Sequence, residues 1–272
     1  MRVLVTGAGG FVGSRIMRML AGQYELHPLP KGMAAGNPDA VLREVARVQP
    51  DMILHTAAIS DTGYCQQHPE ESYRSNVVLS LALAKTGVRL VAFSSDQVYT
   101  GLGGSTPFAE DAPLQPTNVY GQHKREMEQR VLDAAPNAVL LRATWMYDFA
   151  GDGLPLRGNL PLNLLRAAQA GEELGFSARD SRGITWVRDA VQNLPAAMQL
   201  PGGVYNFGCK NPLDMWQTAQ EFCEILNVAP KLMRQDWQRC LAMDTAKARS
   251  GGVVFADTVQ AFRQCVEQCR HR

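Results

Sequence analysis

The sequence predicts an α/β protein built on a doubly wound parallel sheet, and two observations support this fold class. Short apolar runs alternate with amphipathic stretches from the first residues to about Tyr147. A glycine-rich segment, Gly7 to Gly13, separates the first apolar run from the first amphipathic stretch. Such an alternation of strands and helices produces a parallel sheet covered on both faces, which binds ligands beyond the carboxyl ends of its strands.

The elements of the first half follow in order. Each short apolar run predicts a buried strand, and each longer stretch with apolar residues along one side predicts a helix. The predicted strands are Val3–Val5, Tyr24–Leu29, Met52–Leu54, Leu90–Phe93 and Ala138–Leu141. The predicted helices are Phe11–Ala21, Asp39–Val48, Pro69–Thr86 and Tyr120–Ala134.

The second half has a looser pattern. Residues Asp148 to Pro161 are rich in Gly and Pro and predict a loop. Helices are expected over Leu162–Ala170 and Leu213–Leu226, and a strand over Val204–Phe207. We expect residues 1–147 to form a domain around the sheet, and residues 148–272 to form a small substrate-facing lobe that is partly interleaved with it.

Composition excludes several classes of protein. The 272 residues are 46% hydrophobic, enough for a sizeable core, and 27 basic against 26 acidic residues give a net charge of +1. Because no basic block stands out, nucleic acid is not an expected partner. No apolar run approaches membrane-spanning length and the N-terminus lacks the layout of a signal peptide, so we expect a cytoplasmic protein without a membrane partner.

The six cysteines predict no metal site and no disulfide framework. There is no C-x-x-C pair, and no Cys/His cluster has zinc spacing. Cys265 and Cys269 stand four apart on a predicted terminal helix, where a metal or a disulfide is the alternative. Two reduced, partly buried thiols are the interpretation we favour.

The segment from Val3 to Gly13 is typical of a nucleotide-binding turn. It fits G-x-x-G-x-x-G with Gly7, Gly10 and Gly13, whereas the stricter G-x-G-x-x-G fails at Val12. Glycine permits a tight turn and close approach of a pyrophosphate, and the helix N-terminus that follows offers free N–H groups and a positive dipole end. An ordinary glycine-rich turn is the alternative, but the position between an N-terminal strand and a helix favours a Rossmann-type nucleotide site.

The stretch after the second predicted strand bears on the choice of cofactor. NAD binders place a carboxylate there, which accepts a hydrogen bond from the ribose 2′-hydroxyl. This chain has Leu29-Pro30-Lys31-Gly32 at that point, without a carboxylate. Lys31 is either a ligand of a 2′-phosphate or a solvated loop lysine. We therefore expect NADP(H) to be preferred, with NAD(H) possible.

A tyrosine and a lysine at the start of a predicted helix indicate proton-transfer chemistry. Tyr120 and Lys124 are four apart, which places them on one face of the helix. A nearby ammonium favours the phenolate and lowers the pKa of a phenol from its usual value of about 10. Ser94 and Ser95 follow the strand that ends at Phe93 and offer a hydroxyl to a substrate oxygen. A surface pair is the ordinary meaning of Y-x-x-x-K, but the combination with the glycine turn favours a catalytic site of Ser95, Tyr120 and Lys124.

Beyond these motifs, the sequence resembles the extended short-chain dehydrogenase/reductases, and among them the dTDP-4-dehydrorhamnose reductase family. The resemblance extends over most of the chain. Its motifs are Gly7–Gly13, His55–Ala58, Asn76, Phe93–Tyr99, Pro116–Gly121, Arg142–Tyr147, Asp180–Thr185 and Leu241–Lys247.

The resemblance implies a Rossmann-type sheet, a nicotinamide cofactor and reduction of a keto group on a nucleotide-linked deoxysugar. Tyr120 would donate the proton, Lys124 would support it and bind the ribose, and Ser95 would bind the oxygen. The residues assigned to the cofactor, besides Lys31, are Gly7, Gly10, Phe11, Val12, Ala57, Ala58, Asn76, Phe93, Tyr120 and Lys124. Those assigned to the substrate are Ser95, Asp96 and Trp145.

Single residues argue against other reactions that enzymes of this fold catalyse. Elimination of water needs both an acid and a base, and Gln97 stands where related dehydratases carry a glutamate. Epimerases usually keep the ribose-binding acid that this chain lacks. The alternative from another class is a non-catalytic NADP-binding regulator that resembles the regulatory subunit of methionine adenosyltransferase. Neither His55 nor His123 is expected to act in catalysis; a local hydrogen bond accounts for His55.

Extended members of this fold often dimerise through two helices, so a homodimer is the expected assembly. In this chain the helices are Pro69–Thr86 and Tyr120–Ala134. The first carries Val77, Val78, Leu81 and Ala82, which suit either a partner or the protein's own sheet.

Overall fold

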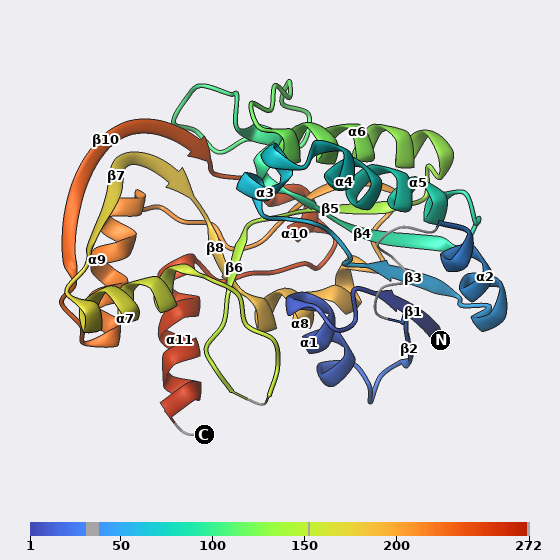
Figure 1. Cartoon of the computed structure of the whole chain (residues 1–272), viewed down its shortest axis with the longest axis horizontal. Helices are drawn as coiled ribbons and strands as arrows, with labels where there is room; N and C mark the ends of the chain where they lie inside the picture. Colours follow the sequence, from blue (N-terminus) through green and yellow to red (C-terminus); the bar gives the residue numbers. More distant parts are fainter. Residues whose placement is uncertain (31–37, 152, 271–272) are drawn as a thin grey trace.

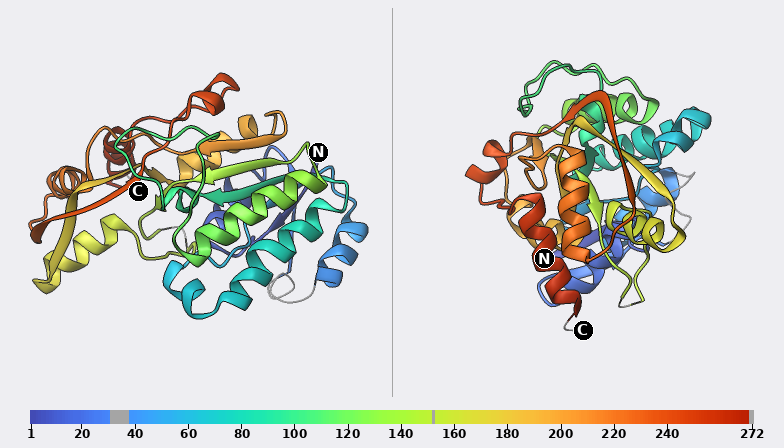
Figure 2. Two further views of the ribbon diagram at one scale, coloured as in Figure 1. Left: turned by 90° about the horizontal axis from the view of Figure 1, so that it is seen from above. Right: turned by 90° about the vertical axis from the view of Figure 1, so that its left-hand side faces the viewer.

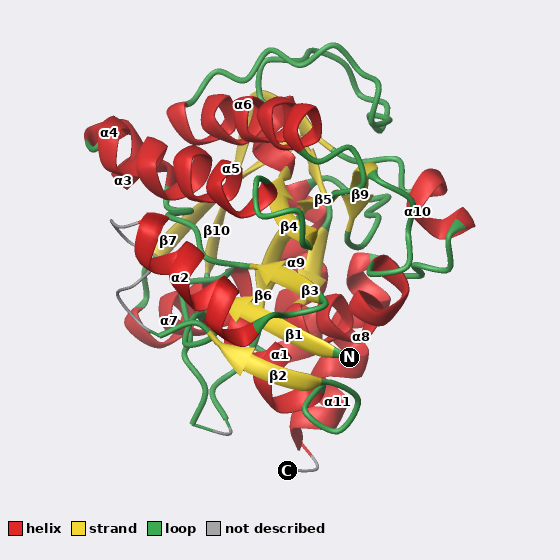
Figure 3. Ribbon diagram, turned by 90° about the vertical axis from the view of Figure 1, so that its right-hand side faces the viewer, coloured by secondary structure: helices red, strands yellow, loops and turns green. Residues whose placement is uncertain are grey.

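The computed structural model describes residues 1–30, 38–151 and 153–270, and a parallel sheet lies at its centre. The strands are β1 (Arg2–Thr6), β2 (Glu25–Pro28), β3 (Met52–His55), β4 (Arg89–Ser95), β5 (Val139–Ala143) and β9 (Gly203–Phe207). They pair in the order β2-β1-β3-β4-β5-β9, and Figure 3 shows helices on both faces. The predicted fold class is confirmed.

One face of the sheet is covered by α1 (Phe11–Met19) and α8 (Val187–Ala197). In α8 the apolar residues Val187, Ala190, Val191 and Leu194 recur every three to four positions, and all are buried. They pack with Ile16 of α1 on the strand residues of this face. Full burial of each large apolar side chain contributes about 1.5–3 kcal/mol to stability. No helix was expected from the sequence over the residues of α8.

The other face is covered by α2 (Pro38–Val48), α5 (Leu79–Ala84) and α6 (Val119–Ala134). The continuous helix predicted over Pro69–Thr86 is wrong in one respect: α4 (Pro69–Tyr73) passes through a π-helical segment, Arg74–Val78, before α5 begins. This wide turn is accompanied by a buried Asn76 whose amide donates to the Ile59 carbonyl at 2.9 Å. A short α3 (Thr62–Gln67), capped by Asp61, precedes it.

The apolar residues proposed for dimerisation divide between two environments. Val77 is buried in the core beneath the sheet. Val78, Leu81 and Ala82 are half-buried. These three are the residues of the group that a second copy would contact.

The C-terminal lobe is a curved ribbon with helices packed on it (Figure 1). β7 (Glu173–Arg182) and β10 (Lys231–Leu241) pair in parallel, with a bulge between Gln235 and Gln238. Phe222 and Phe262, from two of the packed helices, stack at 3.7 Å between ring centroids. The helices are α7 (Leu160–Ala170), α9 (Met215–Leu226) and α11 (Thr258–Arg270).

Two elements of the second half of the chain join the sheet layer. α8 and β9 come from the second half but belong to the sheet layer, where α10 (Ala246–Ser250) lies beside β9. A pair of short strands, β6 (Trp145–Tyr147) and β8 (Ile184–Trp186), connects the sheet with the lobe (Figure 1). In the left view of Figure 2 the helices and the curved ribbon of the lobe lie at one end of the molecule. Buried Arg15 of α1 donates to Asp148 at 3.0 Å and ties the two halves together. A division at residue 147 remains our proposal.

Other sequence predictions concern the six cysteines and the membrane. Cys265 is buried and Cys269 is half-buried, and no disulfide joins them in the structure. Across the described ranges, no helix is both long and apolar enough to cross a membrane. The same residues include no group of three or more His, Cys, Asp or Glu side chains arranged to hold a metal ion.

Candidate active site

A cavity of about 630 Å³ lies at the carboxyl end of the sheet. β1 is flanked by β2 on one side and β3 on the other, so the strand order reverses there and the following connections diverge. Ligands of open α/β sheets bind at such a switch point. The cavity is lined by Gly7 and Gly10 after β1, by Thr56 to Ala58 after β3, and by the end of β4.

The glycine turn is as tight as its sequence predicts. The Gly10 amide donates to the Gly7 carbonyl at 2.8 Å, and Gly7 has a φ of 68°, which favours glycine. A Cβ on Gly13 would lie 2.1 Å from the Gly7 carbonyl oxygen. The turn therefore brings α1 close against the end of β1 only because these positions lack side chains.

The N-terminus of α1 fits the pyrophosphate of a dinucleotide. Gly10 is the N-cap, no side chain caps the helix, and the first turn carries no acidic residue. Its first N–H groups are therefore left for an anion, and the helix dipole adds positive potential there. Gly10, Phe11 and Val12 all line the cavity, where the sequence placed the cofactor.

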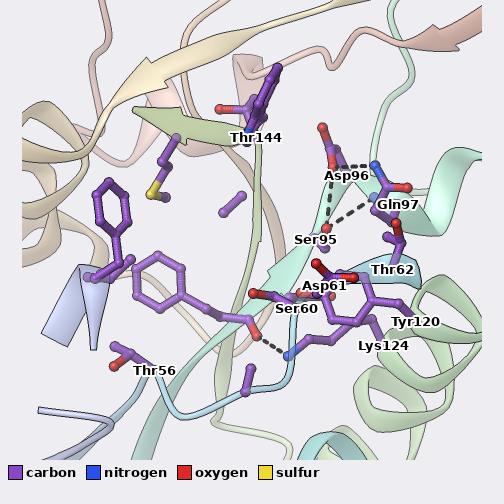
Figure 4. A pocket seen from close by; sticks show the side chains of 18 of the residues that line it. Thr56, Ser60, Asp61, Thr62, Ser95, Asp96, Gln97, Tyr120, Lys124 and Thr144 are labelled. Atoms are coloured by element: carbon purple, nitrogen blue, oxygen red, sulfur yellow. Dashed lines mark hydrogen bonds between the residues drawn. The ribbon is translucent and has the colours of Figure 1, made fainter. Parts of the chain in front are cut away.

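The start of α6 brings Tyr120 against the end of β4. Asn118 is the N-cap, and its side-chain oxygen accepts from the Gly121 amide at 2.8 Å. A Cβ on Gly121 would lie 2.4 Å from the Gln97 carbonyl oxygen, so the helix can approach the segment after β4 this closely only with glycine there. Tyr120 and Ser95 consequently interact in one corner of the cavity (Figure 4).

Lys124 lies one helical turn further along the same face. Its Nζ donates to the Phe93 carbonyl at 2.8 Å and stands 5.7 Å from the centroid of the Tyr120 ring. The side chain is 1% exposed, and burial lowers its pKa to about 8. The ammonium is thus poorly solvated and is available to a polar group that enters the cavity.

The ionisation of Tyr120 differs from the sequence expectation. Burial raises the pKa of the phenol, which outweighs the opposing effects of the Ser95 hydrogen bond and the Arg157 charge. The sequence predicts that Lys124 lowers the pKa of Tyr120. The pKa is raised instead, because Tyr120 is buried as well as close to the ammonium. Tyr120 is therefore a protonated phenol at neutral pH, the form that can give a proton.

Ser95 is held by its neighbours in the chain. Its Oγ accepts from the Gln97 amide at 3.2 Å and donates to Asp96 Oδ1 at 3.3 Å (Figure 4). The first contact caps the short 3-10 helix Asp96–Tyr99, and the second joins Ser95 to the next side chain in the sequence. The hydroxyl is therefore oriented at the strand end, where the sequence analysis placed it.

The cavity brings together most of the residues predicted for the site. Asn76 does not line it; its amide instead supports the loop at Ile59. Lys31 lies outside the described residues. The predicted residues that line the cavity are Gly7, Gly10, Phe11, Val12, Ala57, Ala58, Phe93, Ser95, Asp96, Tyr120, Lys124 and Trp145.

The two histidines that the sequence excluded from catalysis, His55 and His123, have structural partners. His55 contacts Thr6 Oγ1 at 2.7 Å and Ser80 Oγ at 2.9 Å, as expected for a locally satisfied ring. Burial lowers its pKa to about 3, so the imidazole is neutral. His123 contacts Ser72 Oγ at 2.9 Å, away from the cavity.

Three arginines at the site were not predicted: Arg157, Arg182 and Arg239. They belong to separate segments of the second half, and only the fold brings them to the cavity. The signal available for Arg182 was its place inside the Asp180–Thr185 motif, although the motif does not specify that residue type.

Comparison with known proteins agrees with this geometry. The model of the RmlD substrate binding domain matches residues 1–250. A probable dTDP-4,6-dihydroxy-2-methyloxan-3-one 4-ketoreductase of Streptomyces antibioticus is 30% identical over 245 residues, covering 86% of this chain and 80% of that protein. A dTDP-4-dehydrorhamnose reductase of Burkholderia thailandensis is 29% identical over 203 residues, or 73% of this chain and 66% of the relative.

A solved structure has the same fold over almost the whole chain. The dTDP-4-dehydrorhamnose reductase of Bacillus anthracis, solved in complex with NADP, superposes with a TM-score of 0.87. The match covers 98% of this chain and 99% of that one at 20% identity.

Proposed function

The chain belongs to the family that the RmlD substrate binding domain describes, and we propose that it reduces a keto group on a nucleotide-linked deoxysugar. It is an oxidoreductase of the extended short-chain dehydrogenase/reductase type that uses NADP(H), with NAD(H) possible. The observation that carries the proposal is the meeting of Ser95, Tyr120 and Lys124 with the glycine turn in one cavity.

The residues around the cavity suit a nicotinamide dinucleotide. The uncapped N-terminus of α1 would hold the pyrophosphate, and the Lys124 ammonium would hold a ribose hydroxyl. The cofactor, when bound, supplies the hydride. A carbonyl carbon that receives it leaves negative charge on the carbonyl oxygen, and the protein must neutralise that charge.

Ser95 and Tyr120 would supply this neutralisation. Both hydroxyls lie in the same corner of the cavity, so both can donate to one substrate oxygen when the Ser95 hydroxyl turns from Asp96 to the substrate. Donors fixed before the reaction act most strongly where charge develops, since they need no reorganisation. The proton then passes from the Tyr120 hydroxyl to the substrate oxygen, and the Lys124 ammonium stabilises the phenolate that remains.

The test is NADPH consumption with a panel of nucleotide-linked keto sugars and simple ketones. Tyr120→Phe keeps the ring and deletes the hydroxyl, so turnover should fall by about 10²–10⁴-fold while NADPH still binds. Tyr73→Phe is the matched control, because the Tyr73 hydroxyl donates to Glu126 outside the cavity.

Two outcomes would contradict the proposal. A Tyr120→Phe variant with the wild-type rate would remove Tyr120 as the proton donor. Tight NADPH binding without turnover of any ketone in the panel would favour a cofactor-binding regulator instead.

A further inference from the structure

The face of α6 that packs against the end of β4 carries three buried polar residues, of which the proposed proton transfer uses two. Tyr120, Lys124 and Glu128 are four apart, so their side chains follow one another along this face of the helix. Glu128 is 4% exposed. A carboxylate buried to this degree is unfavourable unless it is paired and hydrogen-bonded, so its partners show what holds it there.

Glu128 joins α6 to two neighbouring strands. Its Oε1 accepts from the hydroxyl of Ser94 in β4 at 2.5 Å. The Arg142 guanidinium of β5 donates to the same carboxylate through Nε at 3.0 Å and through Nη2 at 2.7 Å. Ser94 and Arg142 are direct partners in the sheet register, so the carboxylate bridges two adjacent strand positions. This bridge fixes α6 at the point where β4 ends.

Arg142 is itself held by the fold around it. Its Nη1 donates to the Tyr99 hydroxyl at 2.6 Å and to the Glu110 carbonyl at 3.0 Å. The Tyr99 hydroxyl donates in turn to Asn206 of β9 at 2.8 Å. These contacts fix the guanidinium, and through it the Glu128 carboxylate.

The surroundings of Lys124 show what this carboxylate does. The titratable side chains that act on the ammonium or lie beside it are His55 of β3, Cys65 of α3, and Tyr120 and Glu128 of α6. Burial lowers the pKa of His55 and raises the pKa values of Cys65 and Tyr120, so these three are neutral at pH 7. Glu128 alone among the four carries a charge, and that charge favours the ammonium against the effect of burial on the Lys124 pKa. The other charged side chains that line the cavity are Asp61, Asp96, Arg157, Arg182 and Arg239.

We propose that Glu128 is a positioning residue that keeps Lys124 charged and in register with the end of β4. The assignment rests on the proposed function for the role of the ammonium at the cofactor ribose. Lys124 donates to the Phe93 carbonyl. One helical turn further along α6, Glu128 accepts from Ser94, the next residue of β4. Glu128 does not line the cavity, so it acts through Lys124.

The test is the affinity for NADPH as a function of pH, in the wild type and in Glu128→Gln. The amide keeps the size of the side chain and an oxygen for Ser94, and it removes the charge. Loss of a neighbouring carboxylate should lower the pKa of Lys124 by about one unit or more from its value of about 8. NADPH should therefore bind about threefold or more weaker than in the wild type at pH 8. The two affinities should agree within about twofold at pH 6, where both proteins carry the ammonium, and at pH 10, where neither does.

Three variants accompany this measurement. Glu126→Gln is the matched control, because Glu126 lies on the same helix but bonds Tyr73 and Arg130 outside the cavity, so its profile should match the wild type. Glu128→Asp keeps the charge on a shorter side chain, and its affinity at pH 8 should lie closer to the wild type than that of Glu128→Gln. Removal of one partner of a buried ion pair can prevent folding. The double variant Glu128→Gln/Arg142→Gln then replaces the pair by two amides, and it should weaken NADPH in the same pH window by a smaller factor, because a cation is lost as well.

Several results would overturn the assignment. One is a Glu128→Gln profile that coincides with the wild type, and another is an equal loss of affinity at pH 6, 8 and 10, which indicates general damage to the site. The same loss in Glu126→Gln, or a loss in Glu128→Asp as large as in Glu128→Gln, would also count against it. Reduction of keto sugars by the wild type tests the proposed function separately. If no ketone is reduced but NADPH binding depends on Glu128 in this pH window, the assignment stands and the proposed function fails.

Discussion

Replacement of Lys124 by methionine should make the protein more stable while it impairs the site. Lys124 is 1% exposed, and burial lowers its pKa from 10.5 to about 8. At pH 7 the amine is charged in both the folded and the unfolded chain, so the folded state carries the full cost of dehydrating it. Each pKa unit corresponds to about 1.4 kcal/mol, which makes this cost about 3 kcal/mol.

Lys124→Met removes the charge and keeps an unbranched side chain. The variant also loses the hydrogen bond to the Phe93 carbonyl, worth about 1 kcal/mol. The free energy of unfolding should therefore rise by about 2 kcal/mol at pH 7, or about 4–8 °C in Tm for a chain of this size. Affinity for NADPH should fall by about tenfold or more, because a charged donor to the ribose is gone.

The pH dependence of the stability gained in Lys124→Met identifies the cause of that gain. Between pH 8 and 10.5 the unfolded chain holds the Lys124 proton more tightly than the folded protein does, so the cost in the wild type shrinks as pH rises. At pH 10 the cost of dehydrating the Lys124 ammonium in the wild type should be about 1 kcal/mol. The gain on replacement is therefore complete below pH 8, vanishes near pH 10, where the cost equals the lost hydrogen bond, and becomes a loss of about 1 kcal/mol above pH 10.5.

The assay is urea unfolding of the cofactor-free protein at pH 7 and pH 10. Lys85→Met is the control, because Lys85 is exposed and its replacement should change stability by less than about 0.5 kcal/mol. A Lys124→Met variant less stable than the wild type at pH 7 would refute the reasoning. A gain of equal size at both pH values would show that dehydration of the ammonium is not its origin.

Three further predictions concern the cofactor and the assembly. Gly13→Ala should destabilise the protein by about 1–3 kcal/mol and weaken the binding of NADPH, because the added Cβ would lie 2.1 Å from the Gly7 carbonyl oxygen. Gly9→Ala, whose Cβ meets nothing within 4 Å, is the control, and equal Tm values for the two variants would contradict the argument. NADP(H) should bind more tightly than NAD(H) in fluorescence titrations, since Lys31 rather than a carboxylate follows the second strand; a clear preference for NAD(H) would reverse this. The protein should sediment as a dimer formed through α5 and α6, and a strict monomer at high concentration would exclude it.

Local sequence was sufficient for the sheet and for the centre of the site. Strands and helices of the first half follow from hydrophobic periodicity, which depends only on neighbouring residues. The glycine turn follows from the close approach that Gly7 and Gly13 permit. Ser95 and Tyr120 were predicted to meet because a strand end and a helix start were expected at one edge of a parallel sheet.

Tertiary structure decided what depends on segments far apart in the chain. Tyr120 carries a raised pKa because distant segments bury it, an effect that its spacing from Lys124 does not reveal. Arg182 faces Asp96 across 86 positions of sequence, and nothing in either local pattern predicts the pair. Periodicity reports which face of an element is apolar. Desolvation and charge pairing depend on what the rest of the chain packs against that element, so only the folded protein determines them.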